Sequence, residues 1–407
     1  MVSMQRAGIA IFVLSYAGAA CAREARTLTL EEALARARDR APVILAARAR
    51  VEEARGRLTS ASVRARGNPT LEGHAGRRTT DSDDFTDYEI ELTQGLAPAG
   101  RRQDRIASAE AEVSAELAAV EDVAREHILR VATAYFTAAR AVRRSRHLTS
   151  ALDAAAEIAR AAERRFKAGD VAALDVNVAG TVQARARANL LSADAELEAA
   201  LGELRILLGL SGEELLEIDP VLERQPAHDL SGLLELAARR PDIRALEARL
   251  EQAEVDVRVA KSLRQPMFDI GARYDREEGA DIVQGGVTVS IPSFDRGTGE
   301  VAEASARALR IRMEADALRR TVDSEVRTAF EVYQQRQEAA AALGQVTPML
   351  SDSEALASGS YAAGQISLSE MLLVRLNVLE TRLSHVDLLF EAAIAGIRLE
   401  AGAGVLR

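Results

Sequence analysis

The sequence is poor in several kinds of residue, and each shortage limits what the protein can be. It has no tryptophan, and aromatic residues make up only 3% of its 407 residues, too few to anchor a large globular core. Cys21 is the single cysteine, so no disulfide can form within the chain. The net charge of −10 argues against the concentrated basic face that binds nucleic acid.

Long apolar runs are also missing. No stretch after residue 22 approaches the ~20 consecutive apolar residues of a membrane helix. Any membrane span would therefore have to be made of strands.

Motifs for chemistry are absent as well. The five histidines are scattered without the spacing of metal ligands. The sequence has no nucleophile elbow, phosphate-binding loop or paired-cysteine motif. We therefore predict no enzyme activity, no cofactor and no metal site.

The N-terminus, residues 1–22, has the composition of a cleavable secretory signal peptide. A short charged start with Arg6 precedes the apolar run AGIAIFVLSYAGAA, and small residues flank Cys21. Cleavage after Ala22 would remove Cys21, whereas cleavage after Ala20 would leave it as a candidate for lipidation. In either case the sequence predicts export from the cytoplasm.

Two distant stretches share one pattern, which indicates an internal duplication. RRFKAGDVAALDV at residues 164–176 and GSYAAGQISLSEM at 359–371 each place an aromatic residue, a glycine and a carboxylate at the same spacing. Gly169 and Gly364 are 195 positions apart, since 364 − 169 = 195. Each glycine would let the chain reverse direction between two helices.

We expect two repeats with the same order of elements: a helix, a strand hairpin and a long helical hairpin. The predicted boundaries are 23–220 for the first repeat, with its strand hairpin at about 68–97 and its tip near 166–170; 221–228 for a linker; and 229–407 for the second repeat, with its strand hairpin at about 265–292 and its tip near 361–365.

The strands are predicted from the alternation of apolar and polar residues in DYEIELTQGL, MFDIGARYD and GGVTVSIP, with NPTLEGHAGRR as a weaker fourth strand. Such strands have one face for lipid and one for water, as in a membrane barrel wall. We assign Tyr88, Ile90, Ile270 and Val289 to the lipid face and Glu89, Glu91, Asp269 and Arg273 to the water face. Prolines mark the ends of the hairpins, where a missing N–H donor is tolerated: Pro69, Pro98, Pro266 and Pro292.

The helices are predicted from alanine-, leucine- and valine-rich sequence with apolar residues in steps of three and four. One helix from Arg101 to Lys167 would be about 100 Å long at ~1.5 Å per residue. A second returns from Gly169 to about Gly209, and the pair recurs over 298–363 and 366–404. We expect the shorter helices to stack end to end along the long ones, and Pro348 to kink the second long helix.

This ordered set resembles the TolC family of outer-membrane efflux proteins. The resemblance rests on LTLEEALARARDRAP near the start, APAGRR and PSFDRG after the hairpins, and RRFKAGDVAALDV at the tip. It covers the chain from about Thr27 to Gly404. It implies a mainly α fold with a β-barrel portion: a homotrimer whose long α-helical barrel continues into a shared transmembrane β-barrel built from four strands per chain.

The resemblance also implies a function and partners. The protein would be the exit duct of a tripartite efflux system, in the outer membrane with a periplasmic tunnel, served by a periplasmic adaptor protein and an inner-membrane pump. Carried over by position, the residues that would dock the adaptor are Phe166, Gly169, Asp170, Tyr361, Gly364 and Gln365. Asp175 and Glu370 would form an acidic constriction at the tunnel entrance, although Leu373 stands where some members have a further acid.

Other interpretations of the same residues remain open. The tip could be a plain cap, and Asp175 and Glu370 could be ordinary carboxylates near helix N-termini. The duct could instead serve type I protein secretion, or the chain could be a periplasmic coiled-coil scaffold that transports nothing. We expect cargo to pass an acidic lumen; drug, metal ion, dye and peptide all fit such a duct.

Overall fold

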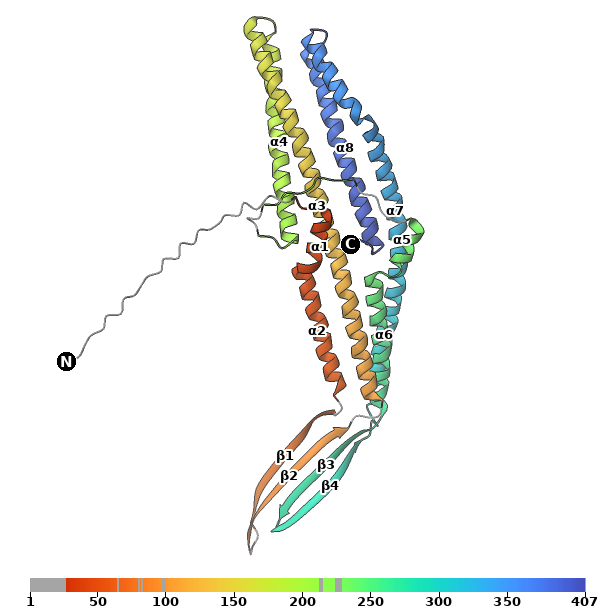
Figure 1. Cartoon of the computed structure of the whole chain (residues 1–407). Coiled ribbons are helices and arrows are strands. Elements are labelled where there is room, and N and C mark those ends of the chain that lie inside the picture. Colours follow the sequence, from red (N-terminus) through yellow and green to blue (C-terminus); the bar gives the residue numbers. More distant parts are fainter. Residues whose placement is uncertain are drawn as a thin grey trace, which may run out of the picture.

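The computed structural model is an elongated molecule with a sheet at one end and two helical hairpins at the other (Figure 1). It describes residues 27–63, 66–79, 81, 83–96, 100–211, 215–223 and 229–406. The predicted signal peptide with Cys21, residues 224–228 of the predicted linker, and Pro98 lie outside these residues. None of the described helices combines the length and apolar character that crossing a membrane would need.

Helices make up most of the described chain, and two of them are very long. The long helices are α3 (Arg101–Ala168) and α7 (Thr298–Ala362). The shorter helices are α1 (Leu30–Arg40), α2 (Pro42–Ser62), α4 (Ala173–Leu207), α5 (Leu230–Ala237), α6 (Pro241–Lys261) and α8 (Leu368–Gly402), with a short 3-10 turn, η1 (Ser262–Arg264), after α6. The first long helix thus ends within one residue of its predicted end.

The shorter helices lie end to end along the long ones. In Figure 1, α2 follows the half of α3 nearer the sheet and α4 follows the other half; α6 and α8 follow α7 in the same way. Both α6 and α8 also contact α3, which joins the two halves of the chain into one helical layer. We call the level at which α2 gives way to α4, and α6 to α8, the waist.

Local sequence explains where several helices begin. The Thr29 hydroxyl accepts a hydrogen bond from the Glu32 N–H (3.3 Å), and the Glu32 carboxylate accepts one from the Thr29 N–H (3.4 Å), which caps α1 at both positions. Pro42 and Pro241 are the first residues of α2 and α6, where a helix needs no N–H donor.

The sheet is a four-stranded antiparallel meander in the order β1-β2-β3-β4. Its strands are β1 (Arg66–Thr79), β2 (Asp84–Leu96), β3 (Met267–Glu277) and β4 (Ala280–Ser290). The central pairing of β2 with β3 joins a hairpin from each half of the chain. Four strands from distant parts of the sequence therefore form one continuous strip.

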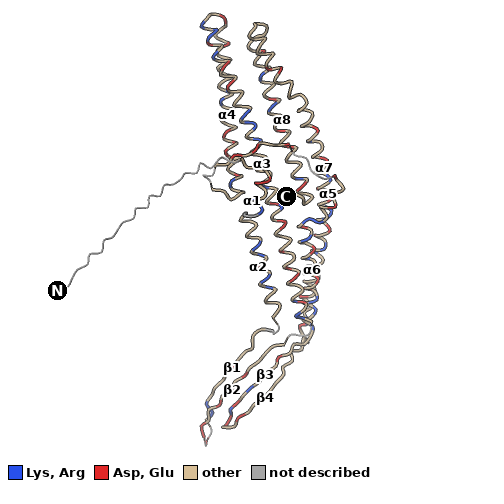
Figure 2. Tube along the Cα trace, in the orientation of Figure 1, with Lys and Arg blue, Asp and Glu red and all other residues tan. Residues whose placement is uncertain are grey.

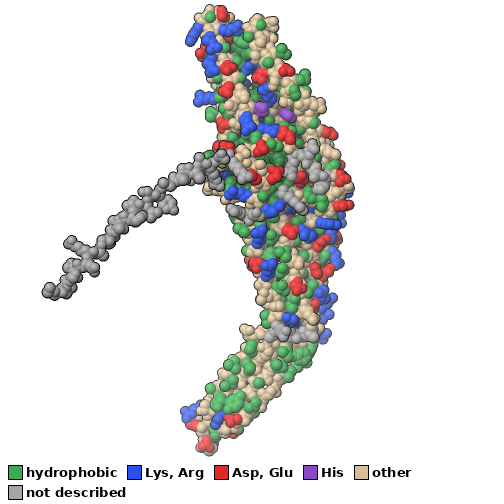
Figure 3. Space-filling model, in the orientation of Figure 1, with side chains coloured by type: hydrophobic (Ala, Val, Ile, Leu, Met, Phe, Trp, Pro, Cys, Tyr) green, Lys and Arg blue, Asp and Glu red, His purple; other side chains and the backbone are tan. Residues whose placement is uncertain are grey.

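The sheet has an apolar and a polar face. Ile90 pairs with Tyr274 on one face, and the next pair along, Glu91 with Arg273, lies on the other. Figure 3 shows hydrophobic side chains gathered on the visible face of the sheet. On the polar face, the Arg273 guanidinium lies 3.2 Å from the Glu89 carboxylate. The apolar and the polar residues that alternate in the sequence thus lie on opposite faces of the sheet.

Ion pairs tie the outer end of the sheet together, where Figure 2 shows acidic and basic residues close to each other. The Arg78 guanidinium donates to the carboxylates of Asp87 (2.8 Å) and Glu278 (2.8 Å). Because Arg78 and Glu278 belong to different hairpins, these contacts link the two hairpin turns.

Of two prolines, Pro69 lies away from its expected place and Pro348 lies inside the second long helix, as expected. Pro69 is inside β1, at a register irregularity between Arg66 and Thr70, and not at the end of the hairpin. The irregularity tolerates a proline because the ladder of hydrogen bonds is already interrupted there. Pro348 lies within an unbroken α7, and Figure 1 shows α7 bending toward α8 in the part nearer its tip. A kink caused by Pro348 itself stays a prediction.

The main core lies at the waist, where α1 and the segment 215–223 pack onto α3, α4 and α8. Tyr135 of α3 is 2% exposed, and its hydroxyl donates to the Asp219 carbonyl (2.8 Å) while lying 3.1 Å from the Leu28 carbonyl. Burial raises the pKa of Tyr135, so its hydroxyl stays a donor. A second core packs α5 against α7 and α8, with Leu233, Val326 and Leu399 fully buried.

Candidate functional site: the paired helical hairpin tips

The first hairpin tip is closed by a left-handed glycine. Gly169 has φ of 85°, a conformation that strains residues with a Cβ atom. The Gly169 N–H donates to the Phe166 carbonyl (3.0 Å), and the Asp170 N–H donates to the Arg165 carbonyl (2.9 Å). This pair of hydrogen bonds forms a Schellman motif, which ends α3 and turns the chain toward α4.

The second tip repeats this geometry. Gly364 has φ of 74°, its N–H donates to the Tyr361 carbonyl (3.1 Å), and the Gln365 N–H donates to the Ser360 carbonyl (2.9 Å). The far ends of the returning helices match as well, because Gly209 after α4 and Gly404 after α8 are both left-handed. Their spacing is again 195, since 404 − 209 = 195.

The two tips pack against each other through a small apolar cluster. Its buried members come from both hairpins: Ala159, Ala162 and Ala179 from the first, and Ala357, Leu368 and Met371 from the second. Beside this cluster the guanidinium of Arg165 lies over the ring of Tyr361. The structure therefore brings the predicted tip residues of both halves to one end of the molecule (Figure 1).

Apolar side chains remain exposed at this end. Phe166 is 46% exposed and Leu174, in the first turn of α4, is 69% exposed. Asp170, Gly364 and Gln365 are exposed too, whereas Tyr361 is half-buried against the first hairpin. Leu174 was not among the residues predicted from the sequence, although it lies only five positions after Gly169.

Asp175 and Glu370 occupy the same position, the third residue of α4 and of α8, but differ in their contacts. The Glu370 carboxylate accepts hydrogen bonds from the N–H (2.7 Å) and hydroxyl (2.9 Å) of Ser367. These bonds hold the pKa of Glu370 below its usual value. Ala172 occupies the place of Ser367 in the first hairpin and makes no side-chain cap. The Glu370 carboxylate thus caps α8, whereas the Asp175 carboxylate takes part in no such cap of α4.

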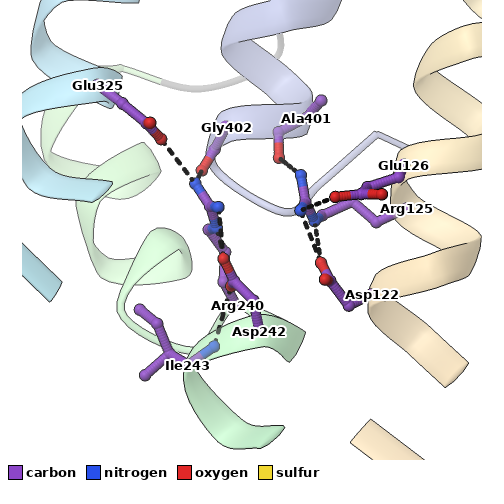
Figure 4. A network of polar contacts seen from close by, with 9 residues as sticks. All are labelled: Asp122, Arg125, Glu126, Arg240, Asp242, Ile243, Glu325, Ala401 and Gly402. Atoms are coloured by element: carbon purple, nitrogen blue, oxygen red, sulfur yellow. Dashed lines mark hydrogen bonds and ion pairs between the residues drawn. The ribbon is translucent and has the colours of Figure 1, made fainter. Parts of the chain in front are cut away.

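Sequence reasoning missed a second organised region, at the end of α8 (Figure 4). The Arg240 side chain, 7% exposed, donates to the Gly402 carbonyl (2.9 Å) and pairs with Asp242 (2.6 Å) and Glu325 (3.4 Å). Positive charge at a helix C-terminus interacts favourably with the helix dipole.

Arg125 of α3 acts at the same helix end. It approaches the Ala401 carbonyl (3.4 Å) and pairs with Asp122 (2.6 Å). The two arginines fix the end of α8 to α3 and α6.

A group of half-buried histidines lies between the waist and the tips. His385 of α8 has its Nδ1 atom 3.3 Å from the Thr347 hydroxyl of α7, and His147 comes from α3. Burial lowers the pKa of both imidazoles, and nearby Arg143 adds to this. Within the described residues no three or more histidine, cysteine, aspartate or glutamate side chains are grouped to hold a metal ion.

Known proteins resemble this chain in sequence and fold. The sequence profile of the family described as outer membrane efflux protein matches residues 33–210 and 233–405. The cobalt-zinc-cadmium resistance protein CzcC of Cupriavidus metallidurans is 29% identical over 212 residues, 51% of this chain and 51% of that protein. The nickel-cobalt-cadmium resistance protein NccC of Alcaligenes xylosoxydans xylosoxydans is 28% identical over 278 residues, 64% of this chain and 59% of that protein.

These matched segments span about half the length of the first relative and less than two thirds of the second. Among solved structures, the CmeC outer membrane channel of Campylobacter jejuni aligns with a TM-score of 0.79, covering 100% of this chain and 94% of that chain at 16% identity. That likeness shows the fold: a long helical layer continuing into a four-stranded sheet. Because the family profile covers most of the sequence in two successive segments, the chain belongs to the outer membrane efflux protein family.

Proposed function

We propose that three copies of this chain form a passive exit duct, with a β-barrel in the outer membrane and a helical tunnel in the periplasm. Cargo enters at the hairpin tips, passes along the helical tunnel and leaves through the barrel. The energy comes from an inner-membrane pump that is joined to the duct by a periplasmic adaptor. In this proposal the repeats 23–220 and 229–407 are structural copies joined by the linker 221–228.

The two-faced sheet is the observation that carries the proposal. Along most of the paired length of β2, β3 and β4, apolar side chains lie on one face and polar side chains on the other, as the wall of a barrel between lipid and water requires. Arg276 and Asp281, near the outer end, are exceptions on the apolar face. Four strands cannot close a barrel, for which about eight is the lower limit. Several copies must therefore supply strands, and three copies would supply twelve.

The tips support the assignment of the adaptor site. Two similar turns lie side by side and expose apolar side chains such as Phe166 and Leu174, which a partner helix could cover. We propose that Phe166, Gly169, Asp170, Tyr361, Gly364 and Gln365 form the docking surface. Asp175 is the better candidate for the acidic constriction, because Glu370 is already hydrogen-bonded to Ser367.

The names of the curated relatives make divalent metal ions the first cargo to test. CzcC and NccC are named for resistance to cobalt, zinc, cadmium and nickel. We propose that this chain serves a comparable efflux system. A strain lacking the chain should become sensitive to these ions, and the plasmid-borne chain should restore growth.

Fractionation and crosslinking test the duct itself. The protein should be recovered in the outer-membrane fraction as a trimer whose gel mobility changes on heating. A soluble periplasmic monomer or dimer would contradict the proposal and favour a scaffold. An outer-membrane trimer that leaves metal sensitivity unchanged would keep the duct and remove metal ions as its cargo.

A further inference from the structure

A groove of about 1050 Å³ lies at the waist between α3, α7 and α8. Apolar side chains such as Val332, Phe390 and Ile394 line part of it. One end adjoins the arginine network of Figure 4, because Glu325 and Gly402 belong to both. Its size is that of sites for drug-sized molecules, which are about 300 to 1,000 Å³.

The charges in this groove do not balance. Arg336 lies 2.6 Å from the Glu391 carboxylate, and Glu325 pairs with Arg240, so both acidic residues of the lining already have a basic partner. Arg320 and Arg398 also line the groove, and the side chain of neither forms an ion pair or hydrogen bond with any other described residue. Arg240 also pairs with Asp242, so the groove and its border hold four arginines against three carboxylates, a net charge of +1. The guanidinium groups of Arg320 and Arg398 are therefore available to an anionic ligand.

Arg398 is notable for its exposure. Residues 392–397 and 399–401 of α8 are all buried, and Arg398 alone among them is exposed. It shares a helix face with Glu391 and Gly402, which also line the groove. The helix thus presents one guanidinium into the groove from an otherwise buried segment.

The groove lies on the side of the helical layer opposite α1, α5 and the segment 215–223. Thr133 lines the groove, whereas Tyr135 contacts Asp219, and residues two apart on a helix point in nearly opposite directions. The same holds on α7, where Ser324 lines the groove and Val326 packs against α5. Inside a duct, α1, α5 and the segment 215–223 would obstruct the passage, so we place them on the outside, and the groove then faces the lumen.

We propose that this groove binds amphiphilic organic anions, molecules with an apolar ring system and a sulfonate or carboxylate group, inside the duct. This inference rests on the proposed function, because only a duct makes this face a lumen. Arg320 and Arg398 bind the anionic group, and the apolar lining contacts the rings. The lumen expected to be acidic from sequence would thus contain a site of net positive charge at the waist, which disfavours a free divalent cation.

A pair of matched dyes tests the proposal. The protein in phosphatidylcholine nanodiscs is titrated with anilinonaphthalene sulfonate, and in parallel with phenylnaphthylamine, which has a similar ring system without the sulfonate. Arg320→Gln and Arg398→Gln should each weaken binding of the sulfonate by about tenfold, since each removes a charge-assisted contact. Binding of the neutral dye should stay unchanged in both variants.

Two control variants sharpen the result. Arg187→Gln removes an exposed arginine of α4 outside the groove and should leave both dyes unaffected. Arg320→Lys keeps the charge and should retain most of the sulfonate binding.

The outcomes separate this inference from the proposed function. A trimer in which the double variant binds the sulfonate as tightly as the parent overturns the groove alone. Loss of the trimer in the arginine variants, with binding unchanged per chain, would mean that the arginines contact a neighbouring copy, and this also overturns the proposal. A parent protein that is no outer-membrane trimer overturns the duct itself.

Discussion

The guanidinium of Arg165 in α3 lies 5.3 Å from the ring centroid of Tyr361 in α7. The two residues belong to different hairpins, so this cation–π contact joins the tips directly. Together with the small cluster of alanine, leucine and methionine beneath it, the contact holds the two hairpins together at the end where cargo would enter.

Loss of this contact should loosen the tips. Arg165→Ala removes an interaction of about 0.5 to 1 kcal/mol, enough to widen the distribution of tip separations without unfolding the helices. Spin labels at Lys167→Cys and Ala362→Cys, in a chain without Cys21, report that distribution. Tyr361→Phe keeps the aromatic ring and should leave the distribution of tip separations unchanged. Equal broadening in both variants would show that the cation–π contact is not the cause.

The two carboxylates near the tips should contribute unequally to ion passage. Asp175→Asn should reduce the cation preference of single channels more than Glu370→Gln, because the Glu370 carboxylate is held by Ser367. Ser367→Ala releases Glu370 and, by removing an N-cap, should cost about 1 kcal/mol of helix stability. Channel recordings in which Glu370→Gln has the larger effect would reverse this assignment.

Neighbouring residues of β4 should respond in opposite ways to the same substitution. Val287 lies on the apolar face, while Thr288 lies on the polar face opposite Asp269. Val287→Arg should impair membrane assembly, since an arginine facing lipid near the bilayer midplane costs about 2 to 4 kcal/mol. Thr288→Arg should assemble normally. Recovery of trimer from the outer membrane measures both, and equal recovery would refute the face assignment.

The buried arginine at the end of α8 should matter far more than an exposed one. Arg240→Ala leaves Asp242 without its close partner and the Gly402 carbonyl without its donor, and it should lower the free energy of unfolding by about 3 kcal/mol. Arg327→Ala removes an exposed pair with Asp323 within α7 and should cost less than about 0.5 kcal/mol. Urea unfolding followed by helical circular dichroism compares them, and similar losses would contradict the ranking.

Stability should fall as the solution becomes acidic. Burial lowers the pKa of His147 and His385 in the folded protein, and nearby arginines, Arg143 for both and Arg382 for His147, oppose a proton there, although Glu223 favours one on His385. Below the usual histidine pKa of about 6.5 the unfolded chain binds protons that the folded chain does not. This contribution to stability is therefore present above about pH 6.5 and lost as the pH falls through the lower folded values.

The thermal unfolding midpoint, measured between about pH 7 and about pH 5, checks this dependence. The double variant His147→Gln/His385→Gln should show a weaker decline over that range. His74→Gln, on the exposed strand β1, should decline as the parent does. A parent midpoint that rises on acidification would have the wrong sign for this explanation.

Local signals explain why much of the architecture could be predicted from sequence. Helices as long as α3 repeat their apolar pattern many times, and Gly169 and Gly364 mark the turns because few other residues tolerate that backbone. Strands such as β2 alternate visibly. The capping box of Ser367 and Glu370 also has a local signal, a serine followed three residues later by a glutamate.

Contacts between distant residues could not be predicted in this way. Arg240 and Gly402 are 162 positions apart, and Arg125 and Ala401 are 276 apart. Nothing local distinguishes Arg240 or Arg398 from the other members of a set of 52 basic residues. Their roles follow from how α6 and α8 pack beside α3 and α7, which only the folded chain reveals.

The outer strands of the sheet, β1 and β4, affect how a single unassembled chain behaves. Each has a paired side and a side whose backbone N–H and C=O groups face no neighbour in the sheet order. Before assembly, a single chain in an aqueous compartment exposes two unpaired strand edges and an apolar sheet face. Both features favour aggregation. The yield of assembled protein should therefore depend on a low concentration of unassembled chains, or on their binding to a chaperone. Slow, low-level synthesis should give more assembled protein than strong overexpression.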